Sequence, residues 1–288
     1  MRDLNYQLKA LCRHNRDGGY TTQRNRERLL SLIADQLHAL GYRGMGARSL
    51  KPKHVEALVA AWQNEALSVG TIKNRMAALR WWAEKVDRRH VVARQNDHYG
   101  IPERVFVSRT SKGRAVDPDQ LARVADPHVR MSLELQQAFG LRREEAIKLR
   151  PSTADRGDLL ELQASWTKGG KPRVVPVRSA AQREVLDRAH RLAGQGSLIP
   201  AQRNYRQQLR IYERHTANAG LSKMHGLRHA YAQRRYEALT GWKAPACGGP
   251  PVASLDEAMR SLDREARLVI SRELGHERGS ITAVYLGN

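Results

Sequence analysis

Residues 159–177 read LLELQASWTKGGKPRVVPV, and they distinguish this chain from a purely helical protein. The run LLELQASWT is strand-like, Gly169 and Gly170 favour a turn, and RVVPV is typical of a returning strand. These features predict an antiparallel hairpin, which we expect to belong to a three-stranded sheet. The other periodic segments are helical, so the predicted fold class is mainly α with a small antiparallel β-sheet (α+β).

The first third of the chain predicts three or four amphipathic helices packed as a small bundle. Apolar residues recur at helical spacing from Leu29 to Leu40, from Val55 to Trp62 and again after Ser68 or Thr71, either of which can begin the third helix. The polar faces of that third helix carry three cations, which fit a solvated basic face and DNA contact equally well: Lys73, Arg75 and Arg80.

Helical periodicity lapses between about residues 91 and 116, where Gly100, Pro102 and Gly113 interrupt it. We interpret this stretch as a polar linker. It separates a helical domain, residues 1–107, for which the basic face leaves DNA binding as an expectation, from a second domain, residues 115–288. Within the second domain, a Gly/Pro-rich stretch at 241–251 precedes a late helix that Ser254 and Glu257 are expected to cap.

The net charge is the most informative bulk property. It is +21, and both parts of the chain are basic, with +12 over residues 1–114 and +9 over the remainder. A surface of this kind suits a polyanion, and nucleic acid is favoured over a membrane surface or the ribosome. No apolar run is long enough to span a bilayer, and two distant cysteines, Cys12 and Cys247, fit neither a disulfide framework nor a zinc site.

Five short segments of the second domain carry the residues from which chemistry can be inferred. In chain order they are GLRREEAIKL (140–149), TKGGKPRVVPV (167–177), HGLRHAYA (225–232), ELGHERG (273–279) and ITAVYLG (281–287). Each alone occurs by chance in many proteins. Together and in this order they resemble the tyrosine recombinase (phage integrase) family, over roughly residues 115–288. The resemblance implies a tyrosine-recombinase catalytic domain preceded by a helical, SAM-like core-binding domain.

The family chemistry explains why these residue types are needed. Attack on a phosphodiester builds negative charge on the non-bridging oxygens, and fixed guanidinium groups stabilise that charge. By the resemblance, Arg142 and Arg228 are this pair, and Tyr285 is the nucleophile that bonds covalently to DNA. A lone histidine is more often structural than catalytic, and His229 keeps that interpretation.

The resemblance also assigns supporting roles. His225 and His276 would orient the phosphate or assist proton transfer. Lys168 would donate a proton to the departing 5′ oxygen, with Lys171, across the same turn, as its rival. Glu145 corresponds to the family's acidic position that supports the active site, although a surface ion pair is the alternative interpretation.

The implied reaction is site-specific recombination without a cofactor or a metal ion. Attack by Tyr285 would give a 3′-phosphotyrosyl bond and a free 5′ hydroxyl, and two rounds of exchange would pass through a Holliday junction. The implied partner is double-stranded DNA, bound by a homotetramer on paired recombination sites, for integration or excision of a phage or mobile element. We expect a cytoplasmic protein, associated with the nucleoid when bound to DNA and not with a membrane.

Two departures from the family pattern stand out. The stretch between Arg228 and His276 is long, apparently through an insertion around 241–262, and the sequence ends three residues after Tyr285, where relatives commonly carry a docking segment. Three alternatives remain: a type IB topoisomerase-like enzyme using the same residue set, a non-catalytic DNA-binding protein with this fold, and a basic structural protein of the ribosome or nucleoid.

Overall fold

The computed structural model describes residues 2–276 and 281–288. The chain divides into two compact units, Met1–Val105 and Phe106–Asn288. Each unit has its own hydrophobic core, one formed within residues 4–101 and the other within residues 116–286. No helix in the described part of the chain is both long and apolar enough to cross a membrane.

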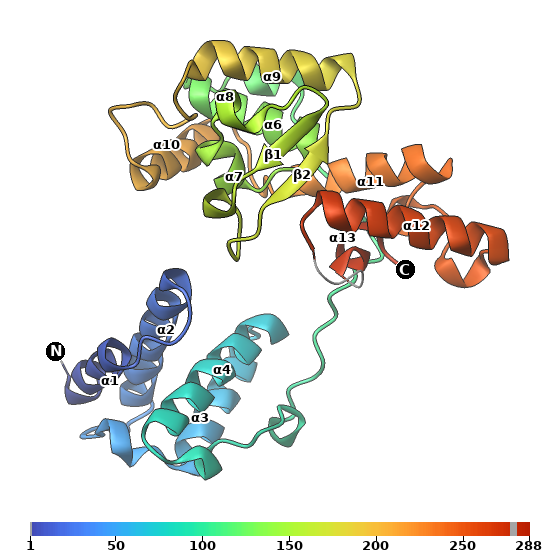
Figure 1. The fold of residues 1–288 in the computed structure, drawn as a ribbon. Coiled ribbons are helices and arrows are strands. Elements are labelled where there is room, and N and C mark those ends of the chain that lie inside the picture. The colour runs from blue at the N-terminus through green and yellow to red at the C-terminus, as the bar shows by residue number, and fades with distance from the viewer. Residues whose placement is uncertain (1, 277–280) are drawn as a thin grey trace. The chain divides into compact units, whose positions relative to one another are not determined.

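The first unit is a helical bundle, as the sequence predicts (Figure 1). Trp62 and Trp82 are completely buried at its centre, and the indole N–H of Trp82 donates to the Ala47 carbonyl at 2.8 Å. Ser68 caps the fourth helix, accepting the Thr71 backbone N–H at 3.3 Å. Its elements are α1 (Asp3–His14), α2 (Tyr20–Ala39), η1 (Ala47–Ser49), α3 (Pro52–Asn64), α4 (Val69–Lys85), η2 (Arg89–Val91) and η3 (Asp97–Tyr99).

The second unit combines helices with one hairpin, which confirms the predicted fold class. Asp126 begins the α6 helix by accepting the Val129 N–H, and Gly140, at φ +61°, ends it in the left-handed conformation. Its elements are α5 (Pro118–Ala122), α6 (Pro127–Phe139), α7 (Arg143–Lys148), α8 (Pro151–Ala154), β1 (Leu159–Leu162), η4 (Ala164–Trp166), β2 (Arg173–Pro176), α9 (Ala180–Ala193), α10 (Tyr205–Asn218), α11 (Gly226–Thr240), η5 (Pro245–Cys247), η6 (Val252–Ser254), α12 (Glu257–Glu273) and α13 (Ala283–Leu286).

The hairpin forms where the sequence predicts it, with β1 and β2 antiparallel and Leu160 opposite Val175. The expectation of a third strand is wrong for the described residues, because the sheet there has two strands. The chain leaves β2 directly into α9, whose N-terminus is capped by the Ser179 hydroxyl. Before β1, only an isolated bridge from Asp155 to Leu160 extends the pairing.

The insertion around 241–262 consists of two short 3₁₀ turns and the first turns of α12. The helix cap differs from the prediction. Asp256, and not Ser254, accepts the backbone N–H of Met259 at 2.8 Å, while the Ser254 hydroxyl donates to the Pro251 carbonyl. An Asp immediately before the helix has the better position for the first free N–H groups.

Helices α11 and α12 lie side by side, with the short α13 against α11 (Figure 1). Two buried tyrosines of α11 tie the pair together. The hydroxyl of Tyr231 donates to Glu273 at 2.7 Å, and that of Tyr236 donates to Asp263 at 2.6 Å. These bonds connect α11, which begins within the HGLRH segment, to α12, which ends just before the LGH segment.

A glycine substitution tests the packing between α6 and α11. A Cβ at Gly140 would lie 2.5 Å from Cδ1 of Tyr231, whereas a Cβ at Gly157, also at positive φ, would meet nothing within 4 Å. Because both positions have a positive φ, at +61° and +78°, both alanine variants strain the backbone, and the clash is the main difference between them. We expect Gly140→Ala to lower the free energy of unfolding by about 1–3 kcal/mol more than Gly157→Ala. Urea denaturation measures both, and equal losses would contradict the packing.

Candidate active site

A completely buried carboxylate, that of Glu145, is the centre of the polar network in the second unit. Its two oxygens accept hydrogen bonds from both terminal nitrogens of Arg173, each at 2.6 Å. They also accept the side chain and the backbone N–H of Arg142, both at 2.7 Å. Glu145 therefore fixes the guanidinium of Arg142 and caps the start of α7 at the same time.

The charge state of Glu145 follows from its neighbours. Burial acts to raise the pKa of this carboxyl, but the hydrogen bonds and charge of Arg173, with the charges of Arg228 and Arg142, outweigh it and lower the pKa to about 2. The group is therefore ionised at neutral pH. One fixed negative charge faces three guanidinium groups, which leaves the site strongly positive.

The two arginines expected to bind phosphate converge on one atom, the carbonyl oxygen of Leu274. Nη2 of Arg142 donates to this oxygen at 3.3 Å, and Nη2 of Arg228 donates to the same oxygen. Arg228 is 1% exposed and also donates to the Gly140 carbonyl at 2.6 Å. Desolvation, followed by the charge of Arg142, lowers the pKa of Arg228 to about 10, so it stays protonated at neutral pH.

Tyr285 lies on α13 in a cage of aromatic and cationic side chains, with 6% of its surface exposed. The His276 ring stacks on it, with centroids 5.3 Å apart, and the His225 ring lies 6.1 Å away. The guanidinium carbon of Arg228 lies 5.9 Å from the centre of the tyrosine ring. The structure therefore brings Tyr285 together with one predicted phosphate-binding arginine and both predicted histidines.

Both predicted histidines beside Tyr285 have a lowered pKa. Desolvation and then the charges of Arg228 and Arg142 lower the pKa of His276 to about 3, and the same causes lower the pKa of His225. His276 presents Nε2 to a guanidinium nitrogen of Arg228 at 3.5 Å, and because arginine only donates, Nε2 holds a lone pair. The lowered pKa keeps both rings uncharged at pH 7.

Lys168 lies in the exposed loop between β1 and β2. Together with Arg142 and His225 it lines a cavity of about 540 Å³, and its charge contributes to the lowered pKa of His225. A larger cavity, of about 720 Å³, lies among α6, α9 and α11 and includes none of the predicted catalytic residues. The smaller cavity is therefore the one that joins the loop cation to the arginine site.

Two residues of this site were not predicted from the sequence. Arg173 is buried on the inward face of β2, and its Nε donates to the Glu273 carbonyl at 2.9 Å. The signal was an arginine at an inward-facing strand position, where a charge needs a buried partner. His229, interpreted as structural, has the histidine ring nearest to Tyr285, at 4.5 Å, and desolvation followed by the charge of His225 lowers its pKa to about 4.

The three cations of the first unit expected to contact DNA have different surroundings. Arg75 is 9% exposed and lies with its guanidinium 5.2 Å from the Trp62 ring. Arg80 donates to the Ala93 carbonyl at 2.9 Å and to Asn96 at 2.8 Å. Lys73 is partly exposed. DNA contact through these residues stays a prediction, and burial makes Arg75 the least accessible of them.

Within residues 2–276 and 281–288, no group of three or more His, Cys, Asp or Glu side chains is arranged to bind a metal ion. Apart from the Glu145 carboxylate and the Tyr285 hydroxyl, the predicted catalytic side chains are guanidinium, imidazole and ammonium groups, whose chemistry matches an anion.

Replacing Glu145 tests its role in the arginine network. The folded pKa of about 2 lies below the value of an unfolded glutamate, so this group stabilises the fold above about pH 5. That stability, about 3 kcal/mol, is lost as the pH falls toward 2. Glu145→Gln is expected to lower the free energy of unfolding at pH 7 by about 3–5 kcal/mol and to remove this pH dependence.

The matched control is the neighbouring Glu144→Gln, because Glu144 is half exposed and forms a surface ion pair with Lys148. We expect a change below about 1 kcal/mol for this variant. Denaturation curves between pH 2.5 and 7 measure both. Similar losses for the two variants would show that the buried network does not depend on Glu145.

Two sequence profiles of known families match the chain. The profile described as "Phage integrase, N-terminal" matches residues 1–92, and the profile described as "Integrase" matches residues 107–234. No curated protein sequence matches significantly.

Solved structures share the fold across nearly the whole chain. A lambda integrase dimer bound to a COC′ core site matches with TM-score 0.62 and 17% identity, over 98% of this chain and 76% of that chain. The Tn1549 transposon integrase in complex with circular intermediate DNA matches with TM-score 0.59 and 14% identity, over 100% and 96%. The XerH recombinase bound to difH matches with TM-score 0.57 and 15% identity, over 98% and 80%.

The two profiles cover both units of the chain, in the order in which the fold presents them. The arginine, histidine and tyrosine side chains that the sequence singled out lie in the second unit, around one site. The chain therefore belongs to the tyrosine recombinase (phage integrase) family.

Proposed function

We propose that this protein is a site-specific DNA recombinase that cleaves and rejoins DNA through a covalent bond to Tyr285. One observation carries the proposal. Arg142 and Arg228 converge on the Leu274 carbonyl, and the Tyr285 ring lies 5.9 Å from the Arg228 guanidinium. A phosphate held by the two guanidinium groups would be close to the tyrosine, as in-line attack requires.

The proposed cleavage step uses the tyrosine, histidine, lysine and arginine side chains of this site. The Tyr285 oxygen attacks the scissile phosphorus, and a neutral histidine of the cage, His276 or His225, accepts the phenolic proton. The bond to the 5′ oxygen breaks as the bond to tyrosine forms, which leaves a 3′-phosphotyrosyl link. Lys168, at the rim of the cavity, donates a proton to the departing 5′ oxygen. The arginines neutralise the charge that develops on the non-bridging oxygens.

The second half of the reaction reverses these steps on a different strand. The 5′ hydroxyl of a partner DNA attacks the phosphotyrosyl bond and releases Tyr285. Since the energy of the broken phosphodiester is conserved in that bond, rejoining needs no nucleotide cofactor. Two such exchanges pass through a Holliday junction and recombine two duplexes.

The partners are double-stranded DNA and further copies of the chain. Lambda integrase has been solved as a dimer on a core site and as a tetramer on a Holliday junction, and XerH before and after cleavage of difH substrates. These relatives support a tetramer on paired sites for this chain. Its charge of +21 favours DNA as the ligand.

The division of labour between the domains is also proposed. Residues 1–107 would form the core-binding domain and residues 115–288 the catalytic domain, with Lys73, Arg75 and Arg80 contacting DNA from the first. We assign integration or excision of a phage or mobile element as the biological role. The protein would act in the cytoplasm, at the nucleoid when bound to DNA.

Covalent trapping on nicked suicide substrates tests the reaction class. The substrates carry candidate sites from DNA flanking the gene, and products are separated on a denaturing gel. We expect a slow-migrating adduct with the wild type and with Tyr231→Phe, and none with Tyr285→Phe, because Tyr285 lies beside the Arg228 guanidinium whereas the Tyr231 hydroxyl is bonded to Glu273. An adduct in Tyr285→Phe would refute the nucleophile, and relaxation of site-free supercoiled DNA would favour the topoisomerase alternative.

The general acid is tested with a DNA whose scissile 5′ oxygen is replaced by sulfur, since a thiolate leaves without a proton. Lys168→Ala is expected to slow cleavage of ordinary DNA by about 10²–10⁴-fold and to cleave the sulfur substrate at nearly the wild-type rate. Lys171→Ala, across the same turn, is the matched control and should show neither effect. The reverse pattern would assign the proton donor to Lys171.

A further inference from the structure

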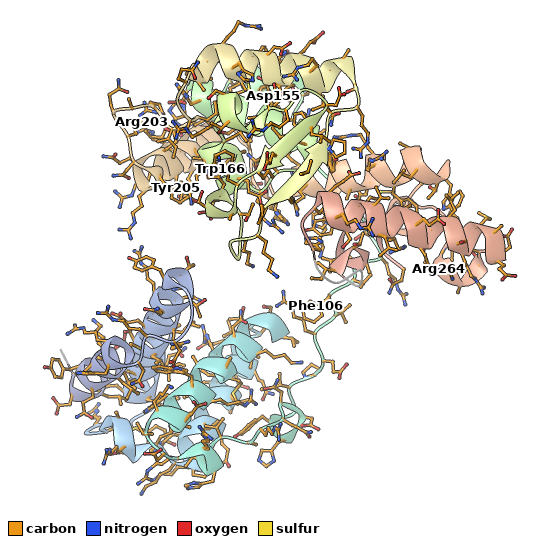
Figure 2. The ribbon with its side chains drawn as sticks, viewed as in Figure 1. Phe106, Asp155, Trp166, Arg203, Tyr205 and Arg264 are labelled. Atoms are coloured by element: carbon orange, nitrogen blue, oxygen red, sulfur yellow. The ribbon has the colours of Figure 1, made fainter. Side chains whose placement is uncertain are left out.

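The segment that leads from the first unit into the second packs against the start of α11. Phe106, labelled in Figure 2, is the first residue of the second unit. A few residues later, the backbone N–H of Arg114 donates to the Gly226 carbonyl at 3.0 Å. A Cβ at Gly226 would lie 2.7 Å from the Lys112 carbonyl oxygen, so the two backbones touch. We call residues 108–114 the connecting segment.

One amide group joins this segment to the nucleophile. The side chain of Gln233 on α11 is buried, with 8% exposed. Its Oε1 accepts the Ser111 hydroxyl at 2.9 Å, and its Nε2 donates to the backbone carbonyl of Tyr285, also at 2.9 Å. The Ser111 oxygen in turn accepts the N–H of Gly113 at 2.9 Å, which fixes its direction. Two hydrogen bonds therefore connect the connecting segment with the backbone of Tyr285.

The helix that carries Tyr285 depends on such external bonds. With four residues, α13 forms few internal hydrogen bonds, and the carbonyls of its last turn need other donors. Gln233 supplies one to Tyr285, and Nη1 of Arg267 supplies another to the Gly287 carbonyl at 3.0 Å. Of these two donors, Gln233 is the one that also bonds the connecting segment.

The histidines around Tyr285 provide a second link between the connecting segment and the site. The positive charge of Lys112 contributes to the lowered pKa of His229, whose ring is 4.5 Å from that of Tyr285. A Cβ on Gly113 would lie 2.6 Å from Oε1 of Gln233, so the segment fits closely over the amide. The path of residues 111–114 thus bears on both the position and the surroundings of the nucleophile.

We propose that Gln233 is a positioning residue that couples the conformation of the connecting segment to the placement of Tyr285. The inference rests on the proposed strand-cleavage function. The first unit ends at Val105, six residues before Ser111. A change in the path of residues 106–110, such as DNA binding by the first unit would produce, therefore reaches the tyrosine through the Ser111–Gln233–Tyr285 bonds.

Single-turnover cleavage of a suicide substrate, with enzyme in saturating excess, tests the coupling in the full chain. Ser111→Ala removes the bond to Gln233 and the local bond from the Gly113 N–H but leaves the Gln233–Tyr285 bond in place, and because Ser111 is exposed this variant keeps the fold. Gln233→Met removes both bonds with little change in volume. We expect Ser111→Ala to slow cleavage by about fivefold and Gln233→Met by about tenfold or more. Ser111→Thr, which keeps the hydroxyl, should restore the rate.

The double variant supplies the decisive comparison. If Ser111 acts through Gln233, Ser111→Ala has no further effect in the Gln233→Met background. Arg267→Lys is the matched control, since Arg267 also bonds α13 but has no bond to the connecting segment. In a variant that combines Arg267→Lys with Ser111→Ala, the fold-reductions in cleavage rate should multiply.

Two further readouts separate positioning from a general loss of structure. Affinity for DNA and the fraction of enzyme that reacts should stay at wild-type values, while the rate falls. Substrates with oxygen or sulfur at the scissile 5′ position should be slowed equally, because the defect lies in attack and not in protonation of the leaving group.

The outcomes are distinguishable. A wild-type rate for Ser111→Ala, or independent effects of Ser111→Ala and Gln233→Met, would overturn the coupling while leaving the cleavage function intact. Failure of the wild type itself to form an adduct on any site would refute the proposed function, and the coupling with it.

Discussion

Both oxygens of the Glu145 carboxylate accept hydrogen bonds from Arg173, and one of them also accepts from the Arg142 side chain. Because the carboxylate is completely buried, its charge requires these partners. Removing the carboxylate would leave guanidinium groups buried without a counter-charge, which costs several kcal/mol. Because Glu145 sits on α7 and Arg173 on β2, the same interaction attaches the hairpin to the helix that presents Arg142. The positions of Arg142 and of the loop bearing Lys168 both depend on it.

A second constraint comes from the Leu274 carbonyl, at the end of α12. It accepts hydrogen bonds from Arg142 and Arg228, which come from different helical segments, and it lies two residues before His276. Desolvation, followed by the charges of Arg228 and Arg142, lowers the pKa of the nearby imidazoles and keeps them neutral. A single cluster therefore explains two requirements of phosphoryl transfer: fixed cations for the phosphate and neutral bases for the phenolic proton.

Much of the fold and of the site could be predicted because the sequence signals were local. The turn at Gly169 and Gly170 specified the hairpin, and the family motifs specified Arg142, Arg228, His276 and Tyr285. The missed features are tertiary. The role of Arg173 depends on a carboxylate 28 residues away, and the approach of His229 to Tyr285 depends on how α11 and α13 pack. The expected third strand is missing from the described residues, where the chain passes from β2 into α9.

The most direct test of the account identifies the atom of the protein that carries DNA. A trapped adduct is digested with nuclease and with trypsin, which cuts after Arg278 and releases residues 279–288, with Tyr285 as their sole tyrosine. Fragmentation in a mass spectrometer then locates the residual nucleotide. The account predicts a 3′-linked nucleotide on Tyr285. A nucleotide on another residue, or a 5′ link, would contradict it.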